Sequence, residues 1–346
     1  MLDLSGDSMA LAGIGLAGGL VLGFAARVGR FCTLGAIEDF HYGGSTTRAR
    51  MWAVALGVAI LTLVAAEAAG LFDPASAIYL SLPPSYPAAA LGGLIFGLGM
   101  ALAGNCGYGA LARLGGGALR SFVIVVVMGL SAMAMVSGPF GPLRAAFQEA
   151  TTFGGPARLT DGLALATGIT PAIFALIAGT ALLALGIWRA DGLRVMWGVP
   201  VGLAVASGFV GSDLISQAAL MDAPSVSHSF AVPLGDTLLY VMLATGIQPS
   251  FGIGSVLGVV LGAFAGSRWQ GRFRWEACDD GRELRRQIGG AALMGAGAVL
   301  AFGCSVGQGL SAASVMAATA PVTMAGIWLG AVLGLRLLIE GRIASI

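Results

Sequence analysis

The chain has 346 residues, of which 57% are hydrophobic and only 10% are charged, and its formal net charge is +1. Soluble domains carry about 25% charged residues, so this composition excludes a water-soluble globular domain. The small net charge offers no electrostatic basis for binding nucleic acid. Apolar runs at 51–72 and 321–338 carry one charge each and are long enough to cross about 30 Å of hydrocarbon. The sequence therefore predicts an all-α, polytopic protein in a lipid bilayer.

The first part of the chain alternates long apolar segments with shorter, more polar ones. We expect long helices at 10–28, 49–71, 88–104 and 119–137, with short segments at 29–48 and after Cys106. The first ten residues lack a basic region and a cleavage site, so we expect the first helix to stay in the mature protein. The longest polar region, 138–167, is interpreted as a linker that joins two halves, 1–140 and 168–346, of one membrane transport domain (1–346).

The second part contains apolar segments at 169–187, 195–210, 232–246, 250–266, 288–303 and 321–339. The loop 268–286, between the segments 250–266 and 288–303, holds six of the 18 arginines. Because an excess of arginine marks cytoplasmic loops, we expect this loop to be cytoplasmic, although a run of charges also suits any solvated surface. Cys278 lies in this loop, and we interpret it as an incidental reduced thiol.

A pattern of glycine and cysteine, G-x8-C-x2-G, recurs along the chain. Its three copies are Gly23, Cys32, Gly35; Gly97, Cys106, Gly109; and Gly295, Cys304, Gly307. A fourth segment, 202–211, has Gly211 where the others have cysteine, which predicts that Gly211 is the counterpart of Cys32, as Cys304 is of Cys106. Paired halves with glycine-interrupted apolar segments indicate a transporter with a central site. The pattern leaves open whether the halves are parallel or inverted.

The glycines around each cysteine have two interpretations. Small residues let membrane helices pack closely, and they also let the chain leave a helix and begin a short half-helix inside the protein. The intervals after Cys106 and Cys304 are short for a span, which favours the break. A half-helix beginning at the cysteine would direct its positive end and unpaired N–H groups at the site, which suits an anion without a basic side chain.

The three motif cysteines are the candidate substrate-binding residues. A single buried cysteine usually serves packing alone, but cysteine at three equivalent positions in a chain with four cysteines predicts a shared function. A thiol is a weak donor and a polarisable group, so its natural partner is a soft, sulfur-bearing ligand. Cys32, Cys106 and Cys304 are thus expected to contact a soft anion.

Other polar residues near the motifs are secondary candidates. Asn105 and Gln308 are candidates for lining the site, or they cap helices. Glu38 and its neighbour Asp39 suit a membrane boundary, or a carboxylate there pairs with Arg30. Asp213 is interpreted as a helix N-cap, and His41 and His228 as structural residues.

The cysteine motifs GRFCTLG, GNCGYG and GCSVGQG resemble those of the YeeE/YedE family of bacterial inner-membrane proteins. The resemblance covers nearly the whole chain and implies an hourglass-shaped bundle of two pseudo-twofold halves, with about thirteen helices and about nine full spans, the others being short and buried. It also implies uptake of thiosulfate, passed through a narrow central path by S–H···S contacts from Cys32, Cys106 and Cys304. A small cytoplasmic sulfurtransferase of the TusA type is an implied partner. Other members are associated with further sulfur or selenium compounds.

Two further functions are less favoured by the residues. A membrane thiol–disulfide oxidoreductase usually has a C-x-x-C pair, which is absent, although distant cysteines can meet in space. A metal permease needs histidine or acidic ligands beside the thiols, and these are missing from the motifs. No phosphate-binding loop of the Walker type is present. We therefore expect a transporter that is not an enzyme and that has no metal and no cofactor.

Overall fold

The computed structural model describes residues 4–188, 192–219, 223–277 and 280–339, so Cys278 lies outside the described residues. In this part the chain forms fourteen α-helices and no β-strand, which confirms the all-α class. Seven helical segments are long and apolar enough to cross a membrane, fewer than the resemblance implies. The difference involves α9 (Pro171–Ile187), which has 17 residues, and α13 (Gly281–Leu300), whose first turns carry several charges.

The helices form two repeats with a connection between them. The first repeat contains α1 (Leu4–Val28), α2 (Thr33–His41), α3 (Thr47–Ala68), α4 (Tyr86–Ala103), α5 (Gly107–Gly115) and α6 (Leu119–Val136). The second contains α10 (Gly198–Ala218), α11 (Val232–Leu243), α12 (Phe251–Trp269), α13, a π-helical turn (Gly307–Ala312) and α14 (Thr319–Ile339). Between them lie α7 (Gly141–Ala150), α8 (Leu159–Thr167) and α9, which packs on α3 and α8.

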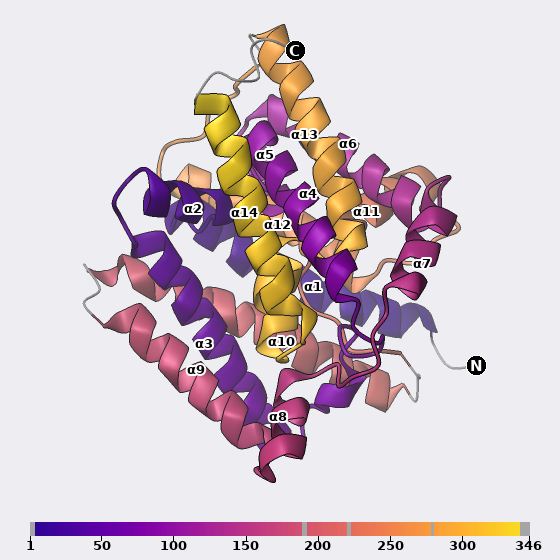
Figure 1. Ribbon diagram of the computed structural model, residues 1–346. Coiled ribbons are helices and arrows are strands. Elements are labelled where there is room, and N and C mark those ends of the chain that lie inside the picture. Colours follow the sequence, from indigo (N-terminus) through magenta and orange to yellow (C-terminus); the bar gives the residue numbers. More distant parts are fainter. Residues whose placement is uncertain (1–3, 189–191, 220–222, 278–279, 340–346) are drawn as a thin grey trace.

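Each repeat packs on the other in the same pattern. In the first, α1 lies along α12 and α4 along α14, and the counterparts of these pairs are α10 along α3 and α13 along α6. Figure 1 shows α4 between α13 and α14 at the front of the molecule. This correspondence matches α1, α2 and α3 with α10, α11 and α12, and α4, α5 and α6 with α13, the π-helical turn and α14. The repeats therefore interlock rather than form separate bundles.

Corresponding helices run in opposite directions where they touch. A Cβ atom on Gly92 would lie 2.5 Å from the backbone nitrogen of Ala301, while one on Gly290 would lie 2.5 Å from that of Ala103, so α4 and α13 are antiparallel. A twofold axis that relates two antiparallel neighbouring helices must be perpendicular to both helix axes. The geometry thus gives the two repeats opposite orientations relative to the membrane, which is the inverted arrangement of many transporters.

The chain leaves each cysteine-bearing arm at a left-handed residue. Arg30, Gly104 and Phe302 have φ angles of 58°, 72° and 58°, and each stands two residues before a motif cysteine. Such a conformation ends an α-helix and turns the chain. It is costly for a residue with a side chain, so the surrounding structure must hold Arg30 and Phe302 in place. The expected helix breaks before all three cysteines are confirmed.

The prediction that Gly211 is the counterpart of Cys32, at the end of a fourth arm, is wrong. Gly211 lies inside α10, which continues without interruption to Ala218, and its Cα faces the side chain of Ile14. Asp213 is likewise inside this helix instead of at an N-cap; its carboxylate accepts hydrogen bonds from Asp73 N and Ser76 Oγ and so holds the connection after α3. The glycine of α10 serves helix packing, which is the other interpretation given for such residues.

The counterpart of Cys32 in the second repeat is Ala231. Cys32 is the N-cap of α2, and Ala231 is the N-cap of α11. Ala231 stands 199 residues after Cys32, and Cys304 stands 198 residues after Cys106, so the two offsets differ by only one residue. The loop after α10 returns the chain to the centre of the molecule at Ser229–Ala231.

The arginines gather at one end of the helices. That end contains the C-terminal ends of α1, α4, α12 and α14 and the N-terminal ends of α3, α6, α10 and α13. Of the arginines that the structure describes, Arg144 and Arg158 lie at the opposite end, in the connection between the repeats. The loop 268–286 belongs to the arginine-rich end, where its residues Arg274 and Glu276 hydrogen-bond the turn after α5.

Candidate functional site

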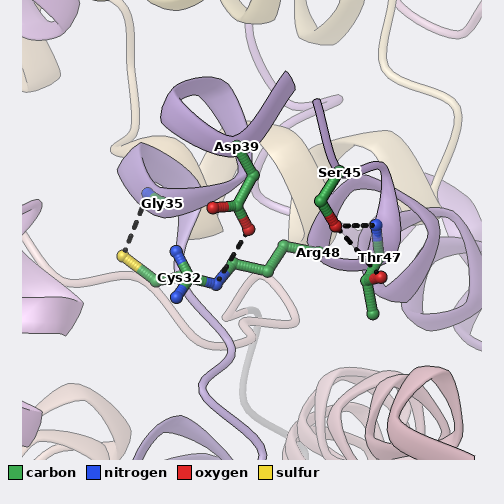
Figure 2. Close-up of polar contacts among 6 residues, drawn as sticks. All are labelled: Cys32, Gly35, Asp39, Ser45, Thr47 and Arg48. Carbon is green, nitrogen blue, oxygen red and sulfur yellow. Dashed lines mark hydrogen bonds and ion pairs between the residues drawn. The ribbon is translucent and has the colours of Figure 1, made fainter. Parts of the chain in front are cut away.

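The three motif cysteines each cap the start of a short helical segment. Sγ of Cys32 accepts the backbone N–H of Gly35 at 3.5 Å, as Figure 2 shows. Cys106 accepts from Gly109, and Cys304 from Gly307, both at 3.4 Å. This is the contact that a serine or aspartate makes at a helix N-cap, with sulfur in place of oxygen. The spacing C-x2-G therefore places a sulfur at the positive end of each half-helix.

The glycines nine residues before the cysteines have a different role. A Cβ on Gly23 would overlap the carbonyl oxygen of Val259 in α12, and one on Gly97 would overlap that of Ile327 in α14. Gly295 faces the carbonyl oxygen of Met128 in α6 in the same way. These glycines let the arms cross their partner helices at backbone distance. The two glycines of each motif thus serve packing and capping respectively.

The cysteines converge in the buried centre. The side chains of Cys106 and Cys304 are 0% and 2% exposed, whereas Cys32 is partly exposed. Cys106 lies near both other thiols and near the hydroxyl of Ser305. Ser305 in turn accepts a hydrogen bond from Thr33 Oγ1 at 3.1 Å. The residues that follow Cys32 and Cys304 therefore join the two repeats around Cys106.

Cys304 lies beside the fourth, thiol-free position. Its Sγ accepts the backbone N–H of Phe230 at 3.2 Å, and the hydroxyl of Ser229 lies 3.8 Å from it. The hydroxyls of Tyr79 and Ser229 both lie at Gly307, where an added Cβ would be 3.0 Å from the first and 2.7 Å from the second. A sulfur, two hydroxyls and a backbone amide are thus concentrated around Gly307.

Two cavities approach the cysteines from opposite ends of the bundle. The serine-lined cavity, about 690 Å³, lies at the N-terminal ends of α1 and α12; its lining includes Ser227, Ser229 and Gly303. The arginine-lined cavity, about 430 Å³, lies at the C-terminal ends of the same helices; its lining includes Cys32 and Asn105. Cys304 and Cys106 are buried between the two, so they form the narrow part of an hourglass.

The secondary candidates fall in different places. Asn105, Arg30 and Glu38 line the arginine-lined cavity together. Gln308 is fully buried; its Nε2 donates to the carbonyl oxygens of Ala301 and Phe302, so it supports the break before Cys304. Among the residues that the structure describes, Arg30 forms no ion pair, and the pair in this region joins Asp39 to Arg48 at 3.3 Å. Of the two interpretations given for Glu38 and Asp39, the pairing with Arg30 is therefore not formed.

The histidines make contacts away from the cysteines. His41 accepts a hydrogen bond from Trp328 Nε1 at 2.9 Å, and the buried His228 shares a hydrogen bond with the Ser255 hydroxyl at 2.6 Å. Both contacts join different parts of the bundle. Among the described residues, no group of three or more histidine, cysteine, aspartate or glutamate side chains gathers in a way that could hold a metal ion.

Sequence reasoning did not identify Tyr79, Ser229 and Arg48. Tyr79 and Ser229 lie in loops with no repeated pattern. Ser229 can be recognised as a site residue only after Ala231, and not Gly211, is identified as the counterpart of Cys32. Arg48 stands 16 residues after Cys32, at the start of α3. The signal that could have found it is Gly35, since a glycine at this position leaves room for the Arg48 guanidinium.

Comparison with known proteins finds two similar transporters and one matching family. The chain is 28% identical over 333 residues to the thiosulfate transporter TsuA of Escherichia coli K12, an alignment that covers 92% of this chain and 90% of that protein. It is 25% identical over 314 residues to TsuA of Spirochaeta thermophila, with 86% and 90% covered. Residues 28–333 match the family described as sulphur transport, and the chain therefore belongs to the sulphur transport family.

Proposed function

We propose that this protein takes up thiosulfate into the bacterial cell through a central path lined by Cys304, Cys106 and Cys32. The observation that carries the proposal is the placement of all three sulfurs at N-terminal ends of half-helices, between two cavities. The two TsuA relatives, similar over nearly their full length, support thiosulfate as the substrate. Residues 1–346 act as one transport domain, with the linker 138–167 between its halves.

The path binds the anion through weak contacts only. The anion enters the serine-lined cavity, meets the Ser229 hydroxyl, and passes from Cys304 to Cys106 and then to Cys32. Each S–H donates to the terminal sulfur of thiosulfate, and the half-helix N–H groups and dipoles stabilise its negative charge. Among the residues that the structure describes, the hydrogen-bond partners of Cys106 and Cys304 include no arginine. The dianion is therefore not held tightly there, and it can leave each position.

The direction follows from the distribution of arginine. Cytoplasmic ends of membrane proteins carry the excess of arginine, and here nearly all of the described arginines lie at the end that contains the loop 268–286. This end faces the cytoplasm of a cell whose inner membrane the protein spans. The serine-lined cavity then opens to the outside, and the arginine-lined cavity opens to the inside.

A small TusA-like sulfurtransferase in the cytoplasm is a suitable acceptor of the imported sulfur, and it would approach at the arginine-rich end. The second candidate substrate is another sulfur or selenium oxyanion. The description of the family is sulphur transport, without a particular substrate. The thiols recognise a soft terminal atom, which several different anions have in common.

A substrate panel tests the proposal. Cells that cannot import sulfate would express the protein and grow on thiosulfate, sulfate, sulfite or selenium analogues as the added source, with an inserted Cys106→Ala variant as the control. We expect growth on thiosulfate that depends on Cys106. Growth on sulfate alone, or equal growth of both proteins on thiosulfate, would show that the thiols do not select the substrate.

A further inference from the structure

The arginine-lined cavity contains more positive charge than a transport path needs. Its lining includes five arginines, Arg27, Arg30, Arg48, Arg113 and Arg272, and one carboxylate, Glu38. Arg27 already has a partner, because its Nε–H donates to the Ser267 hydroxyl at 2.7 Å. Among the described residues, Arg30 and Arg113 form neither a hydrogen bond nor an ion pair through their side chains. The five arginines outnumber the carboxylates beside them, which are Glu38, Asp39 and Glu276, so the cavity that Cys32 lines has a net positive charge.

One of these arginines is held in position over the cysteine cap. The Arg48 guanidinium donates to the Asp39 carboxylate at 3.3 Å and extends toward Cys32 and Gly35 (Figure 2). It lies so close to Gly35 that a Cβ there would overlap its Nη1. The side chains of Arg48 and Asp39 are 28% and 30% exposed, so this pair is less screened than one on an open surface.

The floor of the cavity adds neutral donors to this charge. Asn105, 3% exposed, lies beside the Cys106 cap, where a Cβ on Gly109 would be 3.6 Å from its Oδ1. The α2 half-helix begins at Cys32 and directs its positive end here. Guanidinium groups present paired N–H donors that match the oxygens of an oxyanion. The groups at the floor of the cavity thus suit an oxyanion that presents two or three oxygens and carries two negative charges.

We propose that this cavity is a second anion site, which binds divalent oxyanions through Arg48, Arg30 and Arg113 and recognises charge rather than sulfur. The inference rests on the proposed function, because it gives the transported anion a resting place after Cys32. It also extends that function, since sulfate fits this site as well as thiosulfate does. Asp39 is a positioning residue that keeps the Arg48 guanidinium over Gly35.

Sulfate is therefore the probe that separates this site from the thiols. Binding of radiolabelled sulfate to the purified full-length protein in detergent would be measured across a range of chloride concentrations. We expect saturable binding that weakens as salt rises, and unchanged binding in Cys106→Ala. Arg48→Gln should weaken it about tenfold or more, because a charge-assisted pair of hydrogen bonds is lost.

Two further variants distinguish position from charge. Gly35→Ala keeps every charge but displaces the guanidinium, and we expect it to weaken sulfate binding nearly as much as Arg48→Gln does. Asp39→Asn frees Arg48 and should give a smaller loss. The matched controls are Gly289→Ala, where an added Cβ meets nothing within 4 Å, and Arg285→Gln, which changes an exposed arginine of the same end outside the cavity. Both should bind as the parent does.

The outcomes separate this inference from the proposed function. Absence of sulfate binding by the parent protein, or parental binding by both Arg48→Gln and Gly35→Ala, would overturn the second site even if thiosulfate uptake is normal. Conversely, sulfate binding that depends on Arg48 in a protein that does not transport thiosulfate would retain the site and reject the proposed function. Thiosulfate flux in proteoliposomes made from the same preparation supplies that comparison.

Discussion

The backbone N–H of Phe230 donates to Sγ of Cys304 across 3.2 Å, and this contact connects the thiol-free position of the second repeat to its cysteine. Cys304 also accepts the N–H of Gly307. One sulfur therefore satisfies two amides of the buried centre. The residue is structural and substrate-facing at once, so its replacement has to be assessed by stability and transport separately.

Cys304→Ala should abolish most transport at a moderate cost in stability. The variant leaves the buried Phe230 amide without an acceptor, which costs about 1–3 kcal/mol, and it removes the first thiol of the path. Cys304→Ser restores an acceptor but not the polarisable sulfur, so it should recover stability more than uptake. Initial rates of thiosulfate uptake, normalised to inserted protein, and thermal unfolding in detergent measure the two effects. Parental uptake by Cys304→Ala would contradict the path.

Ser229→Ala should slow uptake without unfolding the protein. Its hydroxyl lies between Tyr79, Cys304 and the serine-lined cavity, where the proposed path begins. Loss of one neutral hydrogen bond of about 0.5–1.5 kcal/mol corresponds to a several-fold slower initial rate. Tyr79→Phe, which removes the other hydroxyl and keeps the ring, should have a smaller effect. A rate in Ser229→Ala equal to that of the parent would remove Ser229 from the path.

Gly23→Ala should destabilise the protein, whereas Gly13→Ala should not. Both glycines lie in α1, but a Cβ on Gly23 would overlap the carbonyl oxygen of Val259, and one on Gly13 meets nothing within 4 Å. Forcing a methyl group into a packed contact costs about 1–3 kcal/mol, while Gly13→Ala gains up to about 1 kcal/mol of helix propensity. Thermal unfolding of the two variants in the same detergent makes the comparison. Equal midpoints would contradict the close crossing of α1 and α12.

Thiol labelling should distinguish the three cysteines by side and depth. In a Cys278→Ser background, a membrane-impermeant maleimide applied to inside-out vesicles should modify Cys32, which is partly exposed in the arginine-lined cavity. Cys106 and Cys304, buried in the narrow part, should react only after denaturation. Labelling of Cys32 in right-side-out vesicles, and not in inverted ones, would reverse the proposed orientation.

Local features of this molecule could be predicted from its sequence, and long-range ones could not. The helix breaks before Cys32, Cys106 and Cys304 follow from glycine content and segment length, which act over a few residues. The capping contacts within C-x2-G are local in the same sense. Arg48 and Ser229 reach the site from other elements, and their positions depend on how the helices pack, which no spacing in the sequence records.

The mistake at Gly211 has a physical cause. Glycine at a helix crossing and glycine at a helix break are the same residue type, and in α10 the spacing of Gly202 and Gly211 matches helix packing against α3 and α1. The break in this repeat comes later and uses no glycine, because the loop after Ala218 is long enough to reach Ala231 by itself. When the two repeats differ in the length of a loop, aligning them by a fixed spacing of glycine and cysteine therefore pairs the wrong residues.

The interlocked repeats determine how the protein can be made. The glycine faces of α1 and α4 are covered by α12 and α14, which are among the last three helices that the ribosome produces. Until then the newly inserted N-terminal helices have only lipid, or an insertion factor, against those faces. The bundle therefore closes after translation of α14, and two fragments separated within 138–167 should each fail alone but assemble when produced together.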